Sequence, residues 1–207
     1  MDEVETINYK GLDINIYPDM DESSPDDWGD DSIFLVAFHS DFTVERKGFD
    51  VDTCRALVDK DEIQEGMEYR TKDIKREYHI FSLEAYIHSG VVLALSQEGN
   101  FPDRQWDVSQ LGLVFIAKSE EKTRAKARKR ALSLIETWND NLSGNVYGYT
   151  IEDTGDSCWG FYGNYNTNGM LDEARAEIDS HLETKRKAKQ KQTRAYIENS
   201  VPLAKRT

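Results

Sequence analysis

The densest group of side chains that could do chemistry is a run of carboxylates near the start of the chain. Seven fall between Pro18 and Ser32: Asp19, Asp21, Glu22, Asp26, Asp27, Asp30 and Asp31. Calcium needs roughly six to eight oxygens that converge on one point, and the stretch lacks the D-x-[DN]-x-[DN]-G-x5-E spacing of an EF-hand, so we predict no metal site. Carboxylates spread over a rigid surface can instead occupy a protein groove meant for phosphates. We predict a partner-binding surface here, with an ordinary solvated loop as the alternative.

A second charged group lies near the end of the chain, in the sequence KRKAKQKQ at 185–192. It contains the predicted partner-binding cations Lys185, Arg186, Lys187 and Lys189, which can contact nucleic acid or an acidic protein. Only one aromatic residue, Tyr196, is interleaved with the cations, so the segment does not predict a platform that stacks single-stranded bases. A solvated helix end is the alternative.

Two histidines and one cysteine are the candidates for nucleophilic catalysis. His39 and His88 each precede a serine, and Cys158 follows an acidic turn at 152–156. A nucleophile and a base of these types would suit a small hydrolase, but the sequence has no G-x-S-x-G elbow and does not fix their pairing in space. The acidic turn should raise the pKa of the Cys158 thiol, which disfavours a reactive thiolate. We therefore predict no catalytic residue and expect Cys158 to be a buried structural cysteine, with a catalytic role as the alternative.

The net charge of −13 is unevenly distributed. Residues 1–62 carry −13, residues 63–182 carry −6 and residues 183–207 carry +6. We therefore expect no direct binding of nucleic acid by the acidic body. The sequence has no zinc-ligand spacing, no P-loop and no G-x-G-x-x-G motif, so no cofactor is predicted. Two cysteines and the lack of an apolar run of about 18 residues predict a cytosolic protein without membrane association.

Strands and helices that could position these residues are visible in the apolar pattern. Alternating or continuous apolar runs predict strands at 12–17, 32–39, 78–87, 91–96, 110–118, 146–151 and 157–163. Capping residues and helical spacing predict helices at about 52–60, at 119–142 with Ser119 as N-cap, and from 169 to about 190. Leu182 ends the apolar stripe of the last helix, so the segment beyond it has no apolar face.

The stretch 138–163 organises the C-terminal half of the chain. Gly144 is placed to end a long helix, because glycine adopts the left-handed conformation without a Cβ penalty. The strand at 146–151, the turn and the strand at 157–163 then form a predicted hairpin. An internal echo is also visible: strand, loop with Pro-Asp and Trp, and apolar strand occur at 11–40 and again at 90–119. This echo predicts two similar hairpins.

Together these patterns predict an α+β fold. We expect an antiparallel sheet of about six strands with two long helices packed on it, in a single domain at 1–182, and a basic helical or flexible tail at 183–207. The expected core combines strand and helix residues: Ile33, Leu35, Ala37, Leu93, Leu95, Leu113, Phe115, Leu132, Ile135, Trp138, Val146, Tyr149 and Trp159.

Four stretches resemble a family of uncharacterised phage and prophage proteins. They are SPDDWGDDSIFLVAFHS, YIHSGVVLAL, WDVSQLGLVFIAK and LSGNVYGYTIEDTGDSCWGFYG, which lie within residues 12–163. The last is the most specific, with the pattern LSGxVYGY followed by DSCWGFYG. The resemblance implies a viral origin and an early or accessory role in an infected bacterium. It implies no activity and no catalytic residues.

These observations lead to one main hypothesis and two alternatives. We expect a phage-encoded acidic interaction protein that acts without catalysis in the host bacterial cytoplasm. It would inhibit a host defence machine, a nuclease or another nucleic-acid-binding assembly, by occupying its basic surface. The expected partner is a host protein or protein–nucleic-acid complex, and homo-oligomers are possible. The first alternative is a small hydrolase or nucleotide-binding enzyme that uses His39, His88 or Cys158, and the second is a virion or assembly component.

Overall fold

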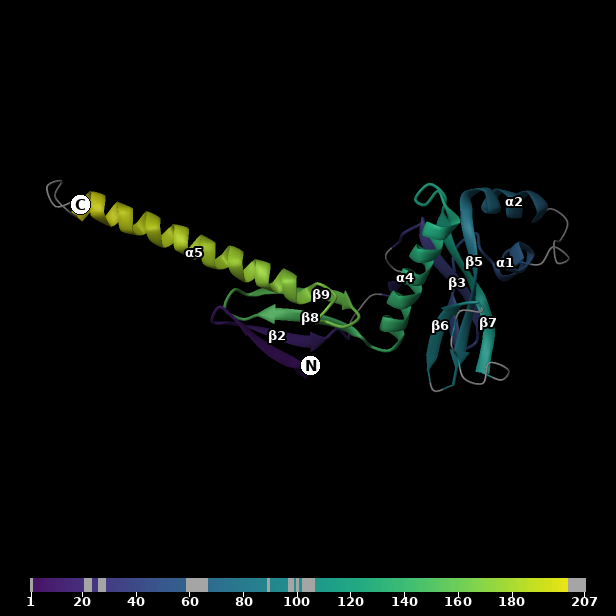
Figure 1. The fold of residues 1–207 in the computed structure, drawn as a ribbon, viewed down its shortest axis with the longest axis horizontal. Coiled ribbons are helices and arrows are strands. Elements are labelled where there is room, and N and C mark those ends of the chain that lie inside the picture. The colour runs from purple at the N-terminus through teal and green to yellow at the C-terminus, as the bar shows by residue number, and fades with distance from the viewer. Residues whose placement is uncertain are drawn as a thin grey trace. The chain divides into compact units, whose positions relative to one another are not determined.

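The computed structural model describes residues 2–20, 24–25, 29–58, 67–88, 90–96, 99, 101 and 107–200. It confirms the α+β class. The chain divides into two compact units, the first made of Met1–Met20 with Val146–Thr207 and the second of Asp21–Asn145. Each unit contains its own antiparallel sheet, and Figure 1 labels most of the elements of both.

The second unit is built on a five-stranded sheet in the order β4-β3-β7-β5-β6. The strands are β3 (Ile33–His39), β4 (Phe42–Val44), β5 (Tyr78–Ile87), β6 (Val91–Leu95) and β7 (Val108–Ala117). Both faces of β7 are covered: Ile116 packs in a cluster with α4 (Arg124–Leu142), whereas Phe115 packs in a cluster with α1 (Val51–Val58) and α2 (Met67–Glu77). Figure 1 shows α4 on one side of this sheet and the other two helices on the opposite side. Burial on both faces explains why the predicted central strands are continuously apolar.

Helix α4 begins five residues later than the sequence predicted. Its N-cap is Thr123, whose hydroxyl accepts a hydrogen bond from the backbone N–H of Lys126 at 3.4 Å, so the prediction of Ser119 was wrong. The helix ends where expected, at Ser143-Gly144. Gly144 has φ +71°, the left-handed conformation that favours glycine.

The first unit is a four-stranded sheet in the order β1-β2-β8-β9. Its strands are β1 (Glu5–Tyr9), β2 (Leu12–Pro18), β8 (Val146–Ile151) and β9 (Asp156–Tyr162), and α5 (Met170–Ser200) packs on one face. The core is a single apolar layer that includes Ile14, Ile16 and Tyr149 from the strands and Ile178 from the helix, all with no exposed surface. The pairing of β8 with β9 confirms the predicted hairpin.

A bulge in this hairpin reverses the face of one predicted core residue. The pairing register shifts between Tyr147 and Tyr149, and Gly160 on β9 has φ +82°. Cys158 and Phe161 therefore both pack toward the core although they are an odd number of residues apart. Trp159 is left on the opposite face and is 41% exposed. The prediction that Trp159 lies in the core was wrong, because a bulge interrupts the regular alternation of side chains between the two faces of a strand.

The sheet and helix numbers also differ from the prediction. There are two sheets rather than one of about six strands, and the two long helices α4 and α5 pack on different sheets rather than on the same one. Of the two shorter helices described, α1 lies where a short helix was predicted, and α2 lies in the segment 61–77, for which the sequence left a second short helix open. The echo does not produce two hairpins, because β2 pairs with β1 and β8 while β6 pairs only with β5. The residues predicted as one domain at 1–182 are divided between the two units, and α5 continues beyond residue 182 to Ser200.

Candidate partner-binding site

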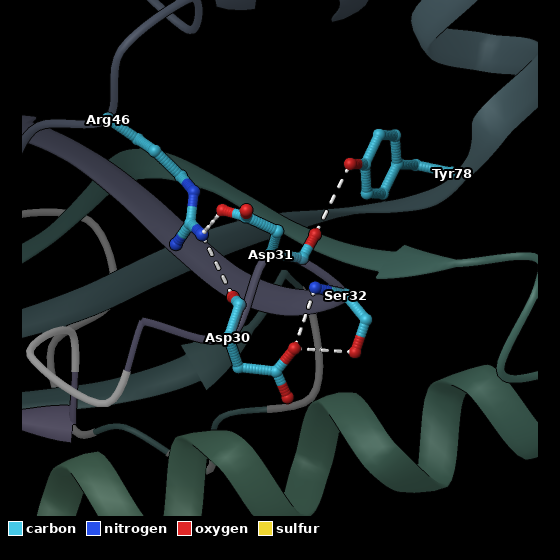
Figure 2. Close-up of polar contacts among 5 residues, drawn as sticks. All are labelled: Asp30, Asp31, Ser32, Arg46 and Tyr78. Atoms are coloured by element: carbon cyan, nitrogen blue, oxygen red, sulfur yellow. Dashed lines mark hydrogen bonds and ion pairs between the residues drawn. The ribbon is translucent and has the colours of Figure 1, made fainter.

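The described part of the acidic stretch in the second unit is Asp30 and Asp31, directly before β3 (Figure 2). The Asp30 carboxylate accepts hydrogen bonds from the Ser32 hydroxyl at 2.6 Å and from the Ser32 backbone N–H at 2.7 Å. These bonds stabilise the ionised carboxylate, and the pKa of Asp30 is lowered, chiefly by the Ser32 hydroxyl. Asp30 is therefore held in one orientation with its negative charge intact at neutral pH.

Asp31 presents its carboxylate from an anchored backbone. Figure 2 shows the Arg46 guanidinium between the two aspartates, where it pairs with the Asp31 carboxylate and donates to the Asp30 backbone carbonyl at 2.9 Å. The Tyr78 hydroxyl donates to the Asp31 backbone carbonyl at 3.2 Å. The Arg46 side chain is only 15% exposed, whereas the Asp31 side chain is 93% exposed. The local structure thus fixes the chain, and the Asp31 carboxylate remains exposed although one of its oxygens pairs with Arg46.

Arg46 is itself held by an aromatic cluster. Its guanidinium carbon lies 4.0 Å from the centroid of the Phe34 ring, a cation–π contact. Phe34 in turn stacks on Phe115 at 5.0 Å and meets Tyr78 edge-on at 5.6 Å. The hydrophobic face of the sheet under α1 and α2 therefore supports the polar network above it. Burial, as the main cause, raises the pKa of Tyr78, so its hydroxyl remains a donor at neutral pH.

Three of the seven predicted acidic residues are described, and they belong to different units. Asp19 belongs to the first unit, where its carboxylate accepts a hydrogen bond from the Gly160 backbone N–H at 2.9 Å and so supports the bulge of β9. Asp30 and Asp31 belong to the second unit. The remaining four, Asp21, Glu22, Asp26 and Asp27, lie outside the described residues.

The predicted basic residues lie together on the last part of α5. Lys185, Arg186, Lys187 and Lys189 are all exposed, as is every residue from Thr184 to Ser200. Glu183 accepts two hydrogen bonds from Arg186, at 2.8 and 2.9 Å, and lies 3.6 Å from Lys187. Pairing with Arg186 lowers the pKa of Glu183 and raises that of Arg186. Tyr196 and Ile197 add apolar surface, being 67% and 38% exposed.

The candidates for catalysis are divided between the two units. His39 Nδ1 accepts a hydrogen bond from the Asp41 backbone N–H at 3.2 Å, while the exposed His88 lies beside Tyr86, with ring centroids 6.2 Å apart. Cys158 is in the other unit and forms no hydrogen bond with a histidine in the part of the chain described. Its pKa is raised as predicted, but the causes are burial and then Glu173 on α5, not the acidic turn.

One charged group was missed by the sequence reasoning. The segment 122–130, KTRAKARKR, holds six cations and no carboxylate, and it covers the start of α4. Positive side chains in the first turns of a helix oppose the helix dipole, so this composition is unusual and could have been recognised from the sequence. It adjoins a basic hollow that is analysed below.

No described helix is long and apolar enough to cross a membrane, and no group of three or more His, Cys, Asp or Glu side chains in the same residues is arranged to hold a metal ion. Comparison with protein-family models finds no matching family, and comparisons with curated proteins and with solved structures find no match either.

Proposed function

We propose that this chain is a phage-encoded acidic protein that binds and inhibits a host defence machine, a nuclease or other nucleic-acid-binding assembly, without catalysing a reaction. The proposed partner is a host protein or its complex with nucleic acid, met in the bacterial cytoplasm. The observation that carries the proposal is the anchored acidic pair. Ser32 holds Asp30 ionised, while Arg46 and Tyr78 hold the backbone of the pair, and the exposed Asp31 carboxylate is oriented by its ion pair with Arg46. A carboxylate positioned in advance loses little conformational freedom when it meets a basic groove.

The charge of the first unit supports the same function. Its body, residues 1–20 and 146–182, contains 12 Asp and Glu against 2 Lys and Arg, a net charge of −10. Such a surface repels phosphates and attracts a basic protein surface, with a strength that falls as salt screens it. The exposed cations of α5 provide a separate contact, either to an acidic region of the partner or to a second copy of this chain.

Competition with nucleic acid tests the proposal directly. Host proteins captured on the immobilised chain should be released by about 0.5 M salt and by excess duplex DNA, because both would compete for a groove that binds phosphates. The variant Asp30→Asn with Asp31→Asn should capture less of the same protein. The matched control is Glu68→Gln with Glu136→Gln, an equal loss of charge at exposed positions of α2 and α4 in the second unit. A captured protein that resists both DNA and salt, or that responds equally to both double variants, would contradict the proposal.

A further inference from the structure

A hollow of about 400 Å³ lies in the second unit beside the first half of β5. Its walls come from the ends of α1 and α2, from β5 and from the segment between β7 and α4, and the residues that matter here are Leu57, Lys75, His79, Ser82, Lys118 and Arg124. Figure 1 shows α2 leading into β5 at the end of the sheet where α4 begins. The volume is within the range of about 300–1,000 Å³ that is usual for small-molecule sites.

The hollow lies beside the part of β5 that β6 does not cover. β6 pairs with β5 from Leu83 to Ile87, and the Ser96 backbone N–H bonds to the Ser82 carbonyl, so no described strand lies beside the outer edge of β5 before Ser82. Arg124 closes this edge: its Nη2 donates to the Ile80 carbonyl at 3.1 Å, and its guanidinium carbon lies 4.5 Å from the centroid of the Phe81 ring. An edge carbonyl and an aromatic ring thus position one cation at the rim of the hollow.

Two lysines complete the basic lining. Lys118 Nζ donates to the Lys75 carbonyl at 2.6 Å, which ties the end of α2 to the segment after β7. Among the described residues, Lys75, Lys118 and Arg124 each lack an ion pair with a carboxylate. Three cations at one hollow repel each other, and an anion bound among them would relieve that repulsion.

His79 adds a polar group with a defined tautomer. Its Nε2 lies 2.9 Å from the Glu121 carbonyl, which can only accept, so Nε2 carries the hydrogen. This bond also fixes the chain just before α4, where the cations of 122–130 follow. The hollow therefore lies within the most basic part of a unit that is otherwise acidic, with 25 Asp and Glu against 16 Lys and Arg in residues 21–145.

We propose that this hollow binds the phosphate group of a small phosphorylated ligand, about the size of a nucleoside phosphate. Lys and Arg donate charge-assisted hydrogen bonds to phosphate oxygens, and the side chain of Leu57 offers an apolar wall to the rest of the ligand. A small ligand is favoured over nucleic acid because the unit as a whole is negative and repels an extended polyanion. The proposed phosphate site uses neither carboxylate of the acidic pair and no residue of α5, although Tyr78, which anchors the Asp31 backbone, also lines the hollow.

Calorimetric titration of the full chain at low ionic strength tests this site, with pyrophosphate, ATP and a short DNA duplex as probes. ATP should bind saturably with one site per chain. Lys75→Ala and Arg124→Ala should each weaken ATP binding about tenfold, the effect of losing one charge-assisted hydrogen bond. Lys72→Ala on α2 and Lys126→Ala on α4 are the matched controls, because both side chains are exposed and outside the hollow. They should change the affinity less than about twofold.

Three outcomes would overturn the proposal. One is the absence of saturable binding of both ATP and pyrophosphate at about 1 mM, a concentration that detects even weak sites. Another is an equal loss of affinity in the hollow and control variants, which indicates diffuse attraction by the basic segment. The third is tighter binding of the DNA duplex than of ATP, with a duplex affinity that falls as much in Lys126→Ala as in Lys75→Ala. This result would indicate that the surface binds nucleic acid. Circular dichroism confirms that each variant is folded before titration.

Discussion

Trp159 lies across Gly148 on the face of the four-stranded sheet that is opposite α5. A Cβ atom added at Gly148 would lie 2.2 Å from Cε3 of the indole ring and 2.9 Å from the Cys158 carbonyl oxygen. The Tyr17 ring completes the group, with its centroid 6.3 Å from that of Trp159. The absence of a side chain on β8 therefore determines where the largest side chain of β9 can lie.

Gly148→Ala should displace the indole ring and destabilise the protein by about 1–3 kcal/mol, because the added methyl group meets both ring and backbone atoms. Urea denaturation measures the stability, and tryptophan fluorescence reports the environment of the ring. Gly90→Ala is the control, since an added Cβ there meets nothing within 4 Å. An unchanged midpoint and spectrum for Gly148→Ala would show that the ring does not need this glycine.

The stability of the second unit should depend on pH through Asp30. Its pKa is lowered in the folded state, so the carboxylate stabilises the fold above the unfolded value of about 3.9, and this contribution is lost as the pH falls through the folded pKa. Asp30→Asn should cost about 0.5–1 kcal/mol at pH 7, a small effect because the group is largely exposed, and should flatten the loss of stability below about pH 4.

Denaturation curves at several pH values check this dependence. Asp153→Asn, which removes an exposed carboxylate from the turn between β8 and β9, is the control and should leave the curve unchanged. A steeper decline in Asp30→Asn than in the native protein would mean that the Ser32 hydrogen bonds do not stabilise the ionised form.

Neither cysteine should react readily in the folded protein. Burial, followed by the nearby Asp50, raises the pKa of Cys54 to about 12. At pH 7.5 its thiolate fraction is then on the order of 10⁻⁵ to 10⁻⁴. Burial and Glu173 also raise the pKa of Cys158. Iodoacetamide should label both residues slowly in buffer and quickly in denaturant, as followed by mass spectrometry.

This labelling experiment also separates the two functional classes. Rapid labelling of native Cys158, together with loss of that reactivity in His39→Ala or His88→Ala, would support the hydrolase alternative. Cys54→Ala and Cys158→Ala serve as matched controls that assign each adduct to one site.

Removal of residues 183–207 should leave the melting temperature nearly unchanged, because residues 184–200 are exposed along their whole length. The deletion should instead change the oligomer size or the affinity for a partner. Light scattering after gel filtration measures the first, and the capture experiment measures the second. Ile178→Ala, which removes a fully buried side chain from the same helix, is the contrasting variant and should cost about 2–4 kcal/mol. The prediction would be contradicted if the truncated chain has a melting temperature several degrees lower but the same oligomer size and partner affinity, because the tail would then be part of the packed core.

Helix ends and hairpins were largely predictable from the sequence, because they depend on residues that are close together in the chain. Gly144 ends α4 where the sequence indicated, and the hairpin of β8 and β9 follows from residues that are close in the chain. The short strand β1 was not predicted, since polar residues make up most of it, whereas β4 lies in the segment 41–50, for which the sequence left a turn and a short edge strand open. The acidic candidates Asp30 and Asp31 were found by composition alone, but nothing in the sequence indicated that Arg46 and Tyr78 anchor them.

The sequence by itself determined the α+β class, the positions of most strands and the two oppositely charged segments, because apolar period and charge are properties of neighbouring residues. Tertiary structure alone decided which strands share a sheet, since β2 pairs with β8 across more than 120 intervening residues while β3 joins the other sheet. It also decided the face of Trp159, through a bulge, and the meeting of Lys75, Lys118 and Arg124 at one hollow. These are contacts between segments that are far apart in the sequence. The apolar pattern of each segment would allow it to pack against several others, so only the folded chain shows which pairing has the lowest free energy.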